Sequence, residues 1–160
     1  MVDIAYRLMC PEEAAEVSAL ILSGFDAHIA PEYTPQGIAE FRKYAEAEAL
    51  VNRTDHDHFI VVATRADIIV GMIEMRQNNH VALLFVAEAF QRQGFSRGLL
   101  GYAVDHIQRQ GGPLERITVN SSRFGVPAYE TLGFRQTGPE RSVNGIIFTP
   151  MAMRLVAGID

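Results

Sequence analysis

The stretch Val86-Ala-Glu-Ala-Phe-Gln-Arg-Gln-Gly-Phe-Ser-Arg-Gly-Leu-Leu100 predicts a turn that leads from a strand into a helix. The six residues that end at Val86 are apolar and uncharged, which is typical of a buried strand. From Ser96 to Gln110, apolar residues recur at the spacing of one helix face. The first N–H groups of such a helix lack intrahelical partners and lie at the positive end of its dipole. The turn is therefore typical of an anion site, most often one for phosphate.

The glycine spacing excludes two common phosphate loops. A Walker loop needs Gly-x-x-x-x-Gly-Lys-Ser/Thr, and the turn contains no lysine. A dinucleotide-binding turn needs Gly-x-Gly-x-x-Gly, whereas the glycines here are Gly94, Gly98 and Gly101. Arg92 and Arg97 flank the turn and could add charge-assisted donors to an anion.

Two segments resemble signatures of the GNAT family of acyl-CoA-dependent N-acetyltransferases. Gln91 to Ser96 reads Gln-x-x-Gly-x-Ser, similar to the family's Arg/Gln-x-x-Gly-x-Gly/Ala loop. Ala128-Tyr-Glu-Thr-Leu-Gly-Phe134 is similar to its Tyr-Glu-x-Leu-Gly-Phe signature. Both occur in the expected order, and the resemblance covers residues 67–155 well. It implies the GNAT fold, an α/β (α+β) domain over residues 1–160 whose mixed sheet has six to seven strands and helices on both faces.

Hydrophobic periodicity predicts the order β-α-α-β-β-β-α-β-α-β-β, which is also that of the family. We expect strands 81–86 and 117–120 to pair in parallel around the helix that begins at Ser96. Thr34 is the expected cap of the second helix, and Ser23-Gly24 the expected end of the first. The other expected strands are 4–8, 59–63, 68–75, 134–137 and 146–153, the other helices are 11–22, 35–50 and 126–132, and the main loops are 25–33 and 138–145.

Composition and charge narrow the class of protein. Nearly half of the 160 residues are apolar, and the net charge of −5 argues against nucleic acid as a partner. No apolar stretch approaches the roughly 20 residues that cross a bilayer, and the N-terminus shows no secretory signal. Cys10 is the single cysteine, so no internal disulfide can form. We expect a cytoplasmic protein that does not act at a membrane.

The charges are unevenly distributed along the chain. Residues 1–60 contain eleven acidic and four basic residues, and the rest contains eight acidic and ten basic ones. All basic residues except Lys43 are arginines, which suit phosphate contacts. This pattern favours an anionic cofactor beside a cationic second substrate, with solvated helix faces as the alternative explanation.

The resemblance implies acetyl-CoA as co-substrate and no metal. Backbone groups at the end of the strand would hold the pantetheine and polarise the thioester, and amides of the loop would hold the pyrophosphate. Gly94 would allow close approach of the phosphate. Ser96 departs from the family's usual Gly or Ala, and Asn120 or Ser122 would contact pantetheine unless they serve only as turn residues. The expected cofactor-binding residues are Phe85, Val86, Gln91, Arg92, Gln93, Gly94, Phe95, Ser96, Arg97, Asn120 and Ser122.

Tyr129 and Glu74 are the expected catalytic residues. The resemblance implies that Tyr129 protonates the leaving thiolate, with a packing role as the alternative. Glu74 is a carboxylate inside an apolar strand and so a candidate base, or else an outward-facing strand residue. His80 could relay a proton through water, and Arg123 is a candidate for the 3′-phosphate of CoA unless it is simply solvated.

Other polar residues are weaker candidates. Glu88 stands where the family often has Pro, so capping the loop is the role expected of it. The segment Asp55-His-Asp-His58 places two histidines on one face if it is extended, but two histidines without further ligands are poor evidence for a metal.

The expected reaction is transfer of an acetyl group to a primary amine of a small molecule, by direct attack in a ternary complex. The N-terminal helices and the loop Phe25–Tyr33 would form the acceptor side. Two alternatives are acetylation of a peptide or protein, at its N-terminus or a lysine, and a non-catalytic CoA-binding sensor on the same fold. The apolar last strand could pair with a neighbour's edge, so a homodimer is possible.

Overall fold

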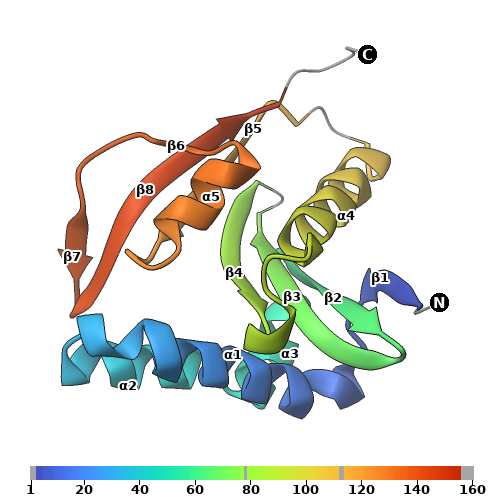
Figure 1. Ribbon diagram of the computed structural model, residues 1–160, viewed down its shortest axis with the longest axis horizontal. Helices are drawn as coiled ribbons and strands as arrows, with labels where there is room; N and C mark the ends of the chain where they lie inside the picture. Colours follow the sequence, from blue (N-terminus) through green and yellow to red (C-terminus); the bar gives the residue numbers. More distant parts are fainter. Residues whose placement is uncertain (1–2, 78, 112–113, 156–160) are drawn as a thin grey trace.

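The computed structural model describes residues 3–77, 79–111 and 114–155 and centres on a mixed sheet of eight strands (Figure 1). The strand order is β1-β2-β3-β4-β5-β8-β6, and β7 pairs with β8. The fold class expected from the sequence is thus confirmed, with one strand more than the expected six to seven. The strands are β1 (Ile4–Leu8), β2 (His58–Arg65), β3 (Ile68–Arg76), β4 (His80–Val86), β5 (Arg116–Ser121), β6 (Arg135–Gln136), β7 (Arg141–Val143) and β8 (Ile146–Arg154).

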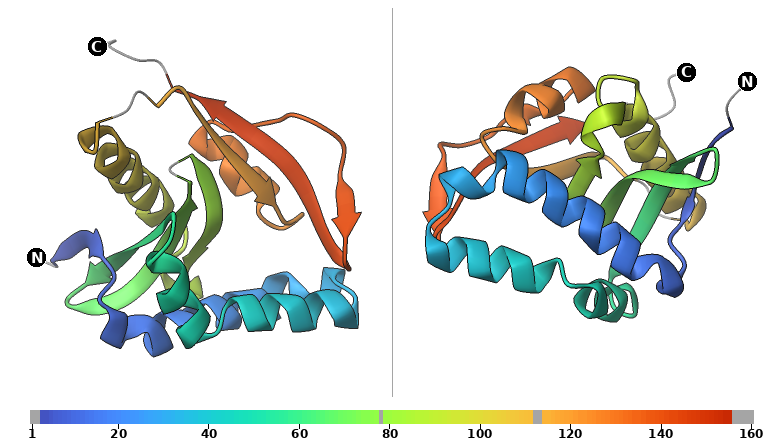
Figure 2. Two further views of the ribbon diagram at one scale, coloured as in Figure 1. Left: turned by 180° about the vertical axis from the view of Figure 1, so that it is seen from behind. Right: turned by 60° about the horizontal axis from the view of Figure 1, so that its bottom comes forward.

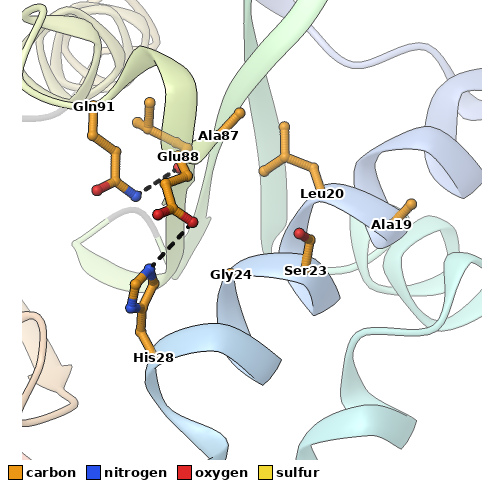
Figure 3. A pocket seen from close by; sticks show the side chains of 9 residues that line it. Ala19, Leu20, Ser23, Gly24, His28, Ala87, Glu88 and Gln91 are labelled. Atoms are coloured by element: carbon orange, nitrogen blue, oxygen red, sulfur yellow. Dashed lines mark hydrogen bonds and ion pairs between the residues drawn. The ribbon is translucent and has the colours of Figure 1, made fainter.

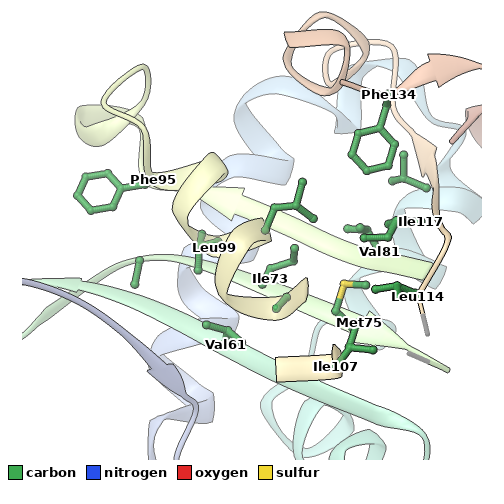
Figure 4. Close-up of a cluster of buried hydrophobic side chains, with 14 of the residues drawn as sticks. Val61, Ile73, Met75, Val81, Phe95, Leu99, Ile107, Leu114, Ile117 and Phe134 are labelled. Carbon is green, nitrogen blue, oxygen red and sulfur yellow. The ribbon is translucent and has the colours of Figure 1, made fainter. Parts of the chain in front are cut away.

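Helices cover both faces of the sheet, and Figure 2 shows α1, α2 and α3 together on one side. Alternate strand residues point to opposite faces, so each face buries its own apolar set. Val61 and Ile73 pack with Leu99 of α4 on one face (Figure 4), and Val62 and Met72 pack with α1 and α3 on the other. The helices are α1 (Ala14–His28), α2 (Pro35–Tyr44), α3 (Ala47–Thr54), α4 (Phe95–Arg109) and α5 (Val126–Leu132), with short 3-10 turns η1 (Pro11–Glu13), η2 (Ala30–Glu32) and η3 (Glu88–Phe90).

The strands β4 and β5 pair in parallel, as expected, but only over two residue pairs, at the start of β4 and the middle of β5. The paired positions are His80 with Thr118 and Val81 with Val119. β4 continues to Val86 alongside β3, while β5 continues alongside β8. The two strands therefore separate toward their carboxyl ends, which is where open α/β sheets bind ligands (Figure 1).

The expected end of the first helix at Ser23-Gly24 is wrong, because α1 continues to His28. Phe25 is fully buried and stacks on Phe41 of α2 at 4.0 Å, so packing carries the helix past the glycine. Gly24 instead allows a close approach: a Cβ there would lie 2.9 Å from the Phe85 ring. The expected loop 25–33 is consequently the last turn of α1 followed by η2.

The expected second helix divides into α2 and α3. Thr34 caps α2 as predicted, since its hydroxyl accepts a hydrogen bond from the Gly37 amide at 3.1 Å. The helix breaks after Tyr44, where the buried Ser18 hydroxyl donates to the Ala45 carbonyl at 2.7 Å. A contact 27 residues away in the chain thus stabilises the break, and local periodicity carries no sign of it.

The strand that the sequence did not predict is β7, which lies in the segment 138–145 that was expected to be a loop. Its three residues are all exposed, so they show no alternation of buried and exposed positions. Asn144 and Gly145 both have positive φ and form the turn that joins β7 to β8. Over the described ranges, no helix is long and apolar enough to cross a membrane.

Candidate active site

The turn before α4 presents free backbone amides. Gly94 is the N-cap residue, with φ of +89°, and no side chain caps the helix. The first backbone hydrogen bond of the helix runs from the Gly98 amide to the Gly94 carbonyl. Among the described residues, the amides ahead of it have no backbone acceptor within the helix, as at any helix N-terminus. They belong to Phe95, Ser96 and Arg97.

The space in front of Gly94 is open. A Cβ built there would meet no atom of the described chain within 4 Å. The positive φ makes glycine the favoured residue, and the open space leaves room for a phosphate against the amides. The turn therefore fits the anion predicted from the sequence.

Most polar side chains of this turn bind the protein itself. The Gln91 amide donates to the Val86 carbonyl at 3.1 Å, and the Gln93 amide donates to Ala89 at 3.3 Å. Arg97, expected to add a donor to the anion, donates instead to the Thr131 carbonyl of α5 at 3.1 Å. The side chains hold the loop in shape, which leaves anion binding to its backbone.

The end of β4 also offers backbone rather than side chains. Phe85 packs toward α2, with its ring 6.2 Å from that of Phe41, and Val86 packs on the opposite, α4 face. Because β5 has diverged at this point, the edge of β4 that faces away from β3 lacks a partner strand. A pantetheine amide could pair with such an edge.

Tyr129 lies on α5, close to the beginning of α4. The hydrogen bond from Arg97 to the Thr131 carbonyl joins these two helices. The Tyr129 ring packs edge-on against Phe134 at 5.3 Å, and burial raises the pKa of its phenol, so the phenol is protonated at neutral pH. Among the described residues, its hydroxyl has no side-chain hydrogen-bond partner. This group can donate a proton.

Glu74 is wholly enclosed on the α3 side of the sheet. Its side chain is 0% exposed, and both carboxylate oxygens bind Arg53, at 2.8 and 2.9 Å. His58 Nδ1 lies 2.6 Å from the same carboxylate, and the Arg53 guanidinium stacks 3.5 Å from the centre of the Tyr44 ring. The carboxylate is fully occupied by these partners, so the arrangement favours a structural role over the base expected from the sequence.

The other expected residues have local partners as well. The Ser122 hydroxyl accepts from the Gly125 amide at 3.0 Å, which is the turn role considered as its alternative. Asn120 is exposed and opposite Pro150 in the register of β5 and β8. Arg123 forms a two-pronged pair with Glu140 at 2.6 and 2.7 Å, which raises the pKa of the guanidinium and lowers that of the carboxyl.

His80 bridges the short parallel pairing of β4 and β5. Its Nδ1 lies 2.7 Å from the Thr118 hydroxyl. Burial, and then the charge of Arg76, lowers the pKa of this imidazole to about 4. The ring is therefore neutral at physiological pH and tied to β5.

A cavity of about 290 Å³ lies between α1 and the end of β4 (Figure 3). His28 and Glu88 face each other across it, with Nε2 3.8 Å from Oε1. His28 and Glu88 are separated in the sequence by two helices and three strands, so no local sequence motif connects them. From the sequence, His28 was expected in a loop and Glu88 only in a capping role. The lining residues are Ala19, Leu20, Ser23, Gly24, His28, Val86, Ala87, Glu88 and Gln91.

The histidines of the segment 55–58 do not converge. His58 contacts Glu74, whereas His56 is exposed and its Nδ1 lies 3.3 Å from the Asn52 carbonyl. Within the described part of the chain, no group of three or more His, Cys, Asp or Glu residues is arranged to hold a metal ion.

Comparison with known proteins assigns both the family and the fold. Residues 29–155 match the model of the acetyltransferase (GNAT) domain. A GCN5-related N-acetyltransferase from Rhodopseudomonas palustris is similar over 94% of this chain and 95% of its own, with a TM-score of 0.79 and 19% identity. The PaiA N-acetyltransferase from Thermoplasma acidophilum, solved with coenzyme A, is similar over 96% of this chain and 99% of its own, with a TM-score of 0.77 and 17% identity. An aminoglycoside 6′-N-acetyltransferase, also solved with coenzyme A, is similar over 98% of this chain and 99% of its own, with a TM-score of 0.70 and 15% identity.

Proposed function

Because the chain belongs to the GNAT acetyltransferase family, we propose that it transfers the acetyl group of acetyl-CoA to a primary amine of a small molecule, by direct attack in a ternary complex. Acetyl-CoA supplies an activated acyl thioester. The chain supplies an anion site, a strand edge and a proton donor.

The free amides at the start of α4 carry this proposal. They lie at the N-terminus of α4, next to a glycine with open space beside it, and a diphosphate bound there would gain backbone hydrogen bonds and the favourable end of the helix dipole. The edge of β4 near Val86 lies at the other end of the same turn, because the Gln91 side chain joins the loop to the Val86 carbonyl. A ligand bound by the turn can therefore extend along the strand.

Tyr129 is the proposed general acid. Its phenol remains protonated at neutral pH, and α5 lies next to the helix that would hold the pyrophosphate. A thiol pKa of roughly 8.5 makes the thiolate a fair leaving group, and donation by the Tyr129 hydroxyl would stabilise the charge that develops on sulfur as the C–S bond breaks.

The size of the cavity favours a small acceptor. Pockets for small molecules span roughly 300 to 1,000 Å³. The cavity beside Val86 has about 290 Å³, which suits a compact amine or the amine-bearing end of a longer one. A peptide substrate would need an extended groove.

Gly94→Asp tests the proposal, with Gly111→Asp as a matched control. Both glycines have positive φ, +89° and +104°, and a Cβ at either meets no described atom within 4 Å. The two changes thus add the same side chain at opposite ends of α4, but only the carboxylate introduced at position 94 would repel a phosphate. We expect Gly94→Asp to weaken acetyl-CoA binding about tenfold to a hundredfold, as loss of charge-assisted hydrogen bonds implies.

Isothermal titration with acetyl-CoA measures the affinity, and thiol release in the presence of amines measures turnover. Wild-type affinity in Gly94→Asp would remove the turn from the binding site. Tight acetyl-CoA binding by the wild type, without thiol release for any amine, would favour the CoA-binding sensor over the enzyme.

A further inference from the structure

Two buried side-chain atoms lack hydrogen-bond partners in the described part of the chain: His28 Nε2 and Glu32 Oε1. His28 is the last residue of α1, and Glu32 is the last residue of η2, in the connection from α1 to α2. Buried polar atoms are almost always paired, so such exceptions call for an explanation, and a functional role is one.

His28 is held in place by an aromatic contact. Its ring stacks on Phe124, with centroids 4.2 Å apart and planes 4° from parallel. Phe124 belongs to the loop between β5 and α5, and is 48% exposed. The stack fixes the plane of the imidazole and leaves Nε2 directed at Glu88 across the cavity (Figure 3).

The distance from His28 Nε2 to Glu88 Oε1 is 3.8 Å, too long for a hydrogen bond, and the Glu88 side chain is 77% exposed, so solvent screens the attraction and neither group is held by the other. Glu88 lies in η3, just after the end of β4, and the cavity that it shares with His28 also contains Val86 and Ala87. The pair therefore lies beside the strand end that we propose holds the thioester.

We propose that His28 is a catalytic residue that takes the proton of the acceptor amine, and that Glu88 binds the ammonium form of that acceptor. This inference rests on the proposed acetyl transfer. An ammonium held by Glu88 gives one proton to His28 Nε2, and the freed nitrogen lone pair forms the C–N bond to the acetyl carbon. As the C–S bond breaks, the sulfur takes the proton of Tyr129, and the nitrogen gives its second proton to the resulting phenolate, which leaves an amide, a thiol and a protonated His28.

The charged groups around His28 favour a cationic acceptor. Glu88 faces it from the turn after β4, and Glu32 lies one turn beyond it in the chain. The nearby bases are already paired: Arg42 binds Asp26 at 2.6 Å, and Arg123, next to Phe124, binds Glu140. The Glu88 carboxylate, which lines the cavity, thus remains for the substrate, and this points to a compact aliphatic amine that is protonated in solution.

His28→Gln tests this role, with His56→Gln as control, because His56 is an exposed histidine outside the cavity. Thiol release from acetyl-CoA is measured with 1,4-diaminobutane, 2-phenylethylamine and Nα-acetyl-lysine amide as probes. At pH 7 we expect His28→Gln to lower kcat about a hundredfold, as for loss of a general base. Acetyl-CoA affinity remains that of the wild type, and His56→Gln behaves as the wild type.

The pH profile separates proton transfer from packing. The deficit of His28→Gln is expected to shrink toward pH 10, since the amine is then deprotonated in solution and needs no base. Glu88→Gln is expected to raise the KM for the amine about tenfold, with a smaller change in kcat. A deficit that is constant across pH would assign His28 to structure and overturn the inference.

The remaining outcomes distinguish the two proposals. Wild-type turnover together with an unchanged kcat in His28→Gln would overturn the role of His28 and leave the acetyl transfer standing. Failure of the wild type to release thiol with all three amines, while it still binds acetyl-CoA, would overturn both transfer to small amines and the role of His28.

Discussion

Two regions of this molecule place a histidine against a carboxylate, and they differ in how completely the polar atoms are paired. Around Glu74, on the α3 side of the sheet, Arg53 and His58 occupy both carboxylate oxygens at 2.6 to 2.9 Å. Around His28, at the end of β4, the imidazole nitrogen and the Glu88 carboxylate remain 3.8 Å apart beside a cavity.

The difference separates a cluster whose polar atoms are all paired from one that we propose takes part in the reaction. A buried carboxylate is tolerated only when hydrogen-bond partners replace the water that it has lost. Glu74 can be buried because both of its carboxylate oxygens have such partners. A group that must exchange protons with a substrate needs an unused position. His28 Nε2 and the Tyr129 hydroxyl have such positions, and Glu74 does not.

The largest expected effect is that of Glu74→Gln on stability. The change keeps the volume but leaves the Arg53 guanidinium, 16% exposed, without its counter-charge. Breaking a buried ion pair from one side costs about 3–5 kcal/mol. For a domain of this size each kcal/mol lowers the Tm by about 2–4 °C. Thermal and urea unfolding measure the loss.

The matched control for that variant is Glu140→Gln. Its partner Arg123 also makes a two-pronged contact, but both side chains are exposed, and such pairs contribute little to stability, so Glu140→Gln is expected to unfold as the wild type does. The fraction of Glu74→Gln that remains folded is expected to retain the wild-type kcat. Normal stability combined with a lost kcat would instead make Glu74 the base and reverse the comparison.

Tyr129→Phe is expected to have the next largest effect. The change removes only the hydroxyl and keeps the ring that packs edge-on against Phe134. Loss of a general acid lowers kcat about a hundredfold, and acetyl-CoA affinity changes little. Steady-state kinetics and titration with acetyl-CoA measure the two quantities.

Tyr102→Phe is the control, because Tyr102 lies on α4 and packs partly buried against the same core. It is expected to keep the wild-type kcat. If Tyr129→Phe lost affinity and kcat in equal measure, the ring would serve packing, and Tyr129 would move to the structural side of the comparison.

The sequence predicted those features that depend on neighbours in the chain. The apolar run to Val86, the glycine turn and the helix that follows were all readable, and α5 was predicted with its observed bounds. The Thr34 cap is equally local. These elements form the turn at which we propose that the anion binds, so the location of the candidate site was accessible from the sequence.

The partners of the polar side chains were not accessible. Glu74 was correctly singled out as unusual, but Arg53 and His58 lie 21 and 16 residues away, and only the packing of α3 on the sheet makes it a closed cluster. Likewise, His28 meets Glu88 because packing between Phe25 and Phe41 prolongs α1 beyond its glycine. Long-range packing decides which polar side chain has all its hydrogen-bond partners and which keeps an unpaired atom.

His80 is a third histidine, intermediate between the two regions, and its expected effect is the smallest. It is half-buried and bonded to Thr118, and its pKa is lowered from 6.5 to about 4. Between these values the unfolded chain binds more protons than the folded one, so stability falls as the pH drops from 6.5 to 4. Allowing for partial exposure, we expect a loss of about 1–2 kcal/mol.

His80→Gln keeps a donor for Thr118 and should abolish this part of the loss, measured as the difference between two urea-unfolding series against pH. The hydrogen bond from Arg7 lowers the pKa of Glu13 from 4.5 to about 2. Protonation of Glu13 therefore destabilises the fold only below pH 4.5, and most of the range from pH 6.5 to 4 reports on His80 alone. Superimposable series for the wild type and His80→Gln would show that His80 is freely solvated, and would leave the diverging strands joined by their backbone alone.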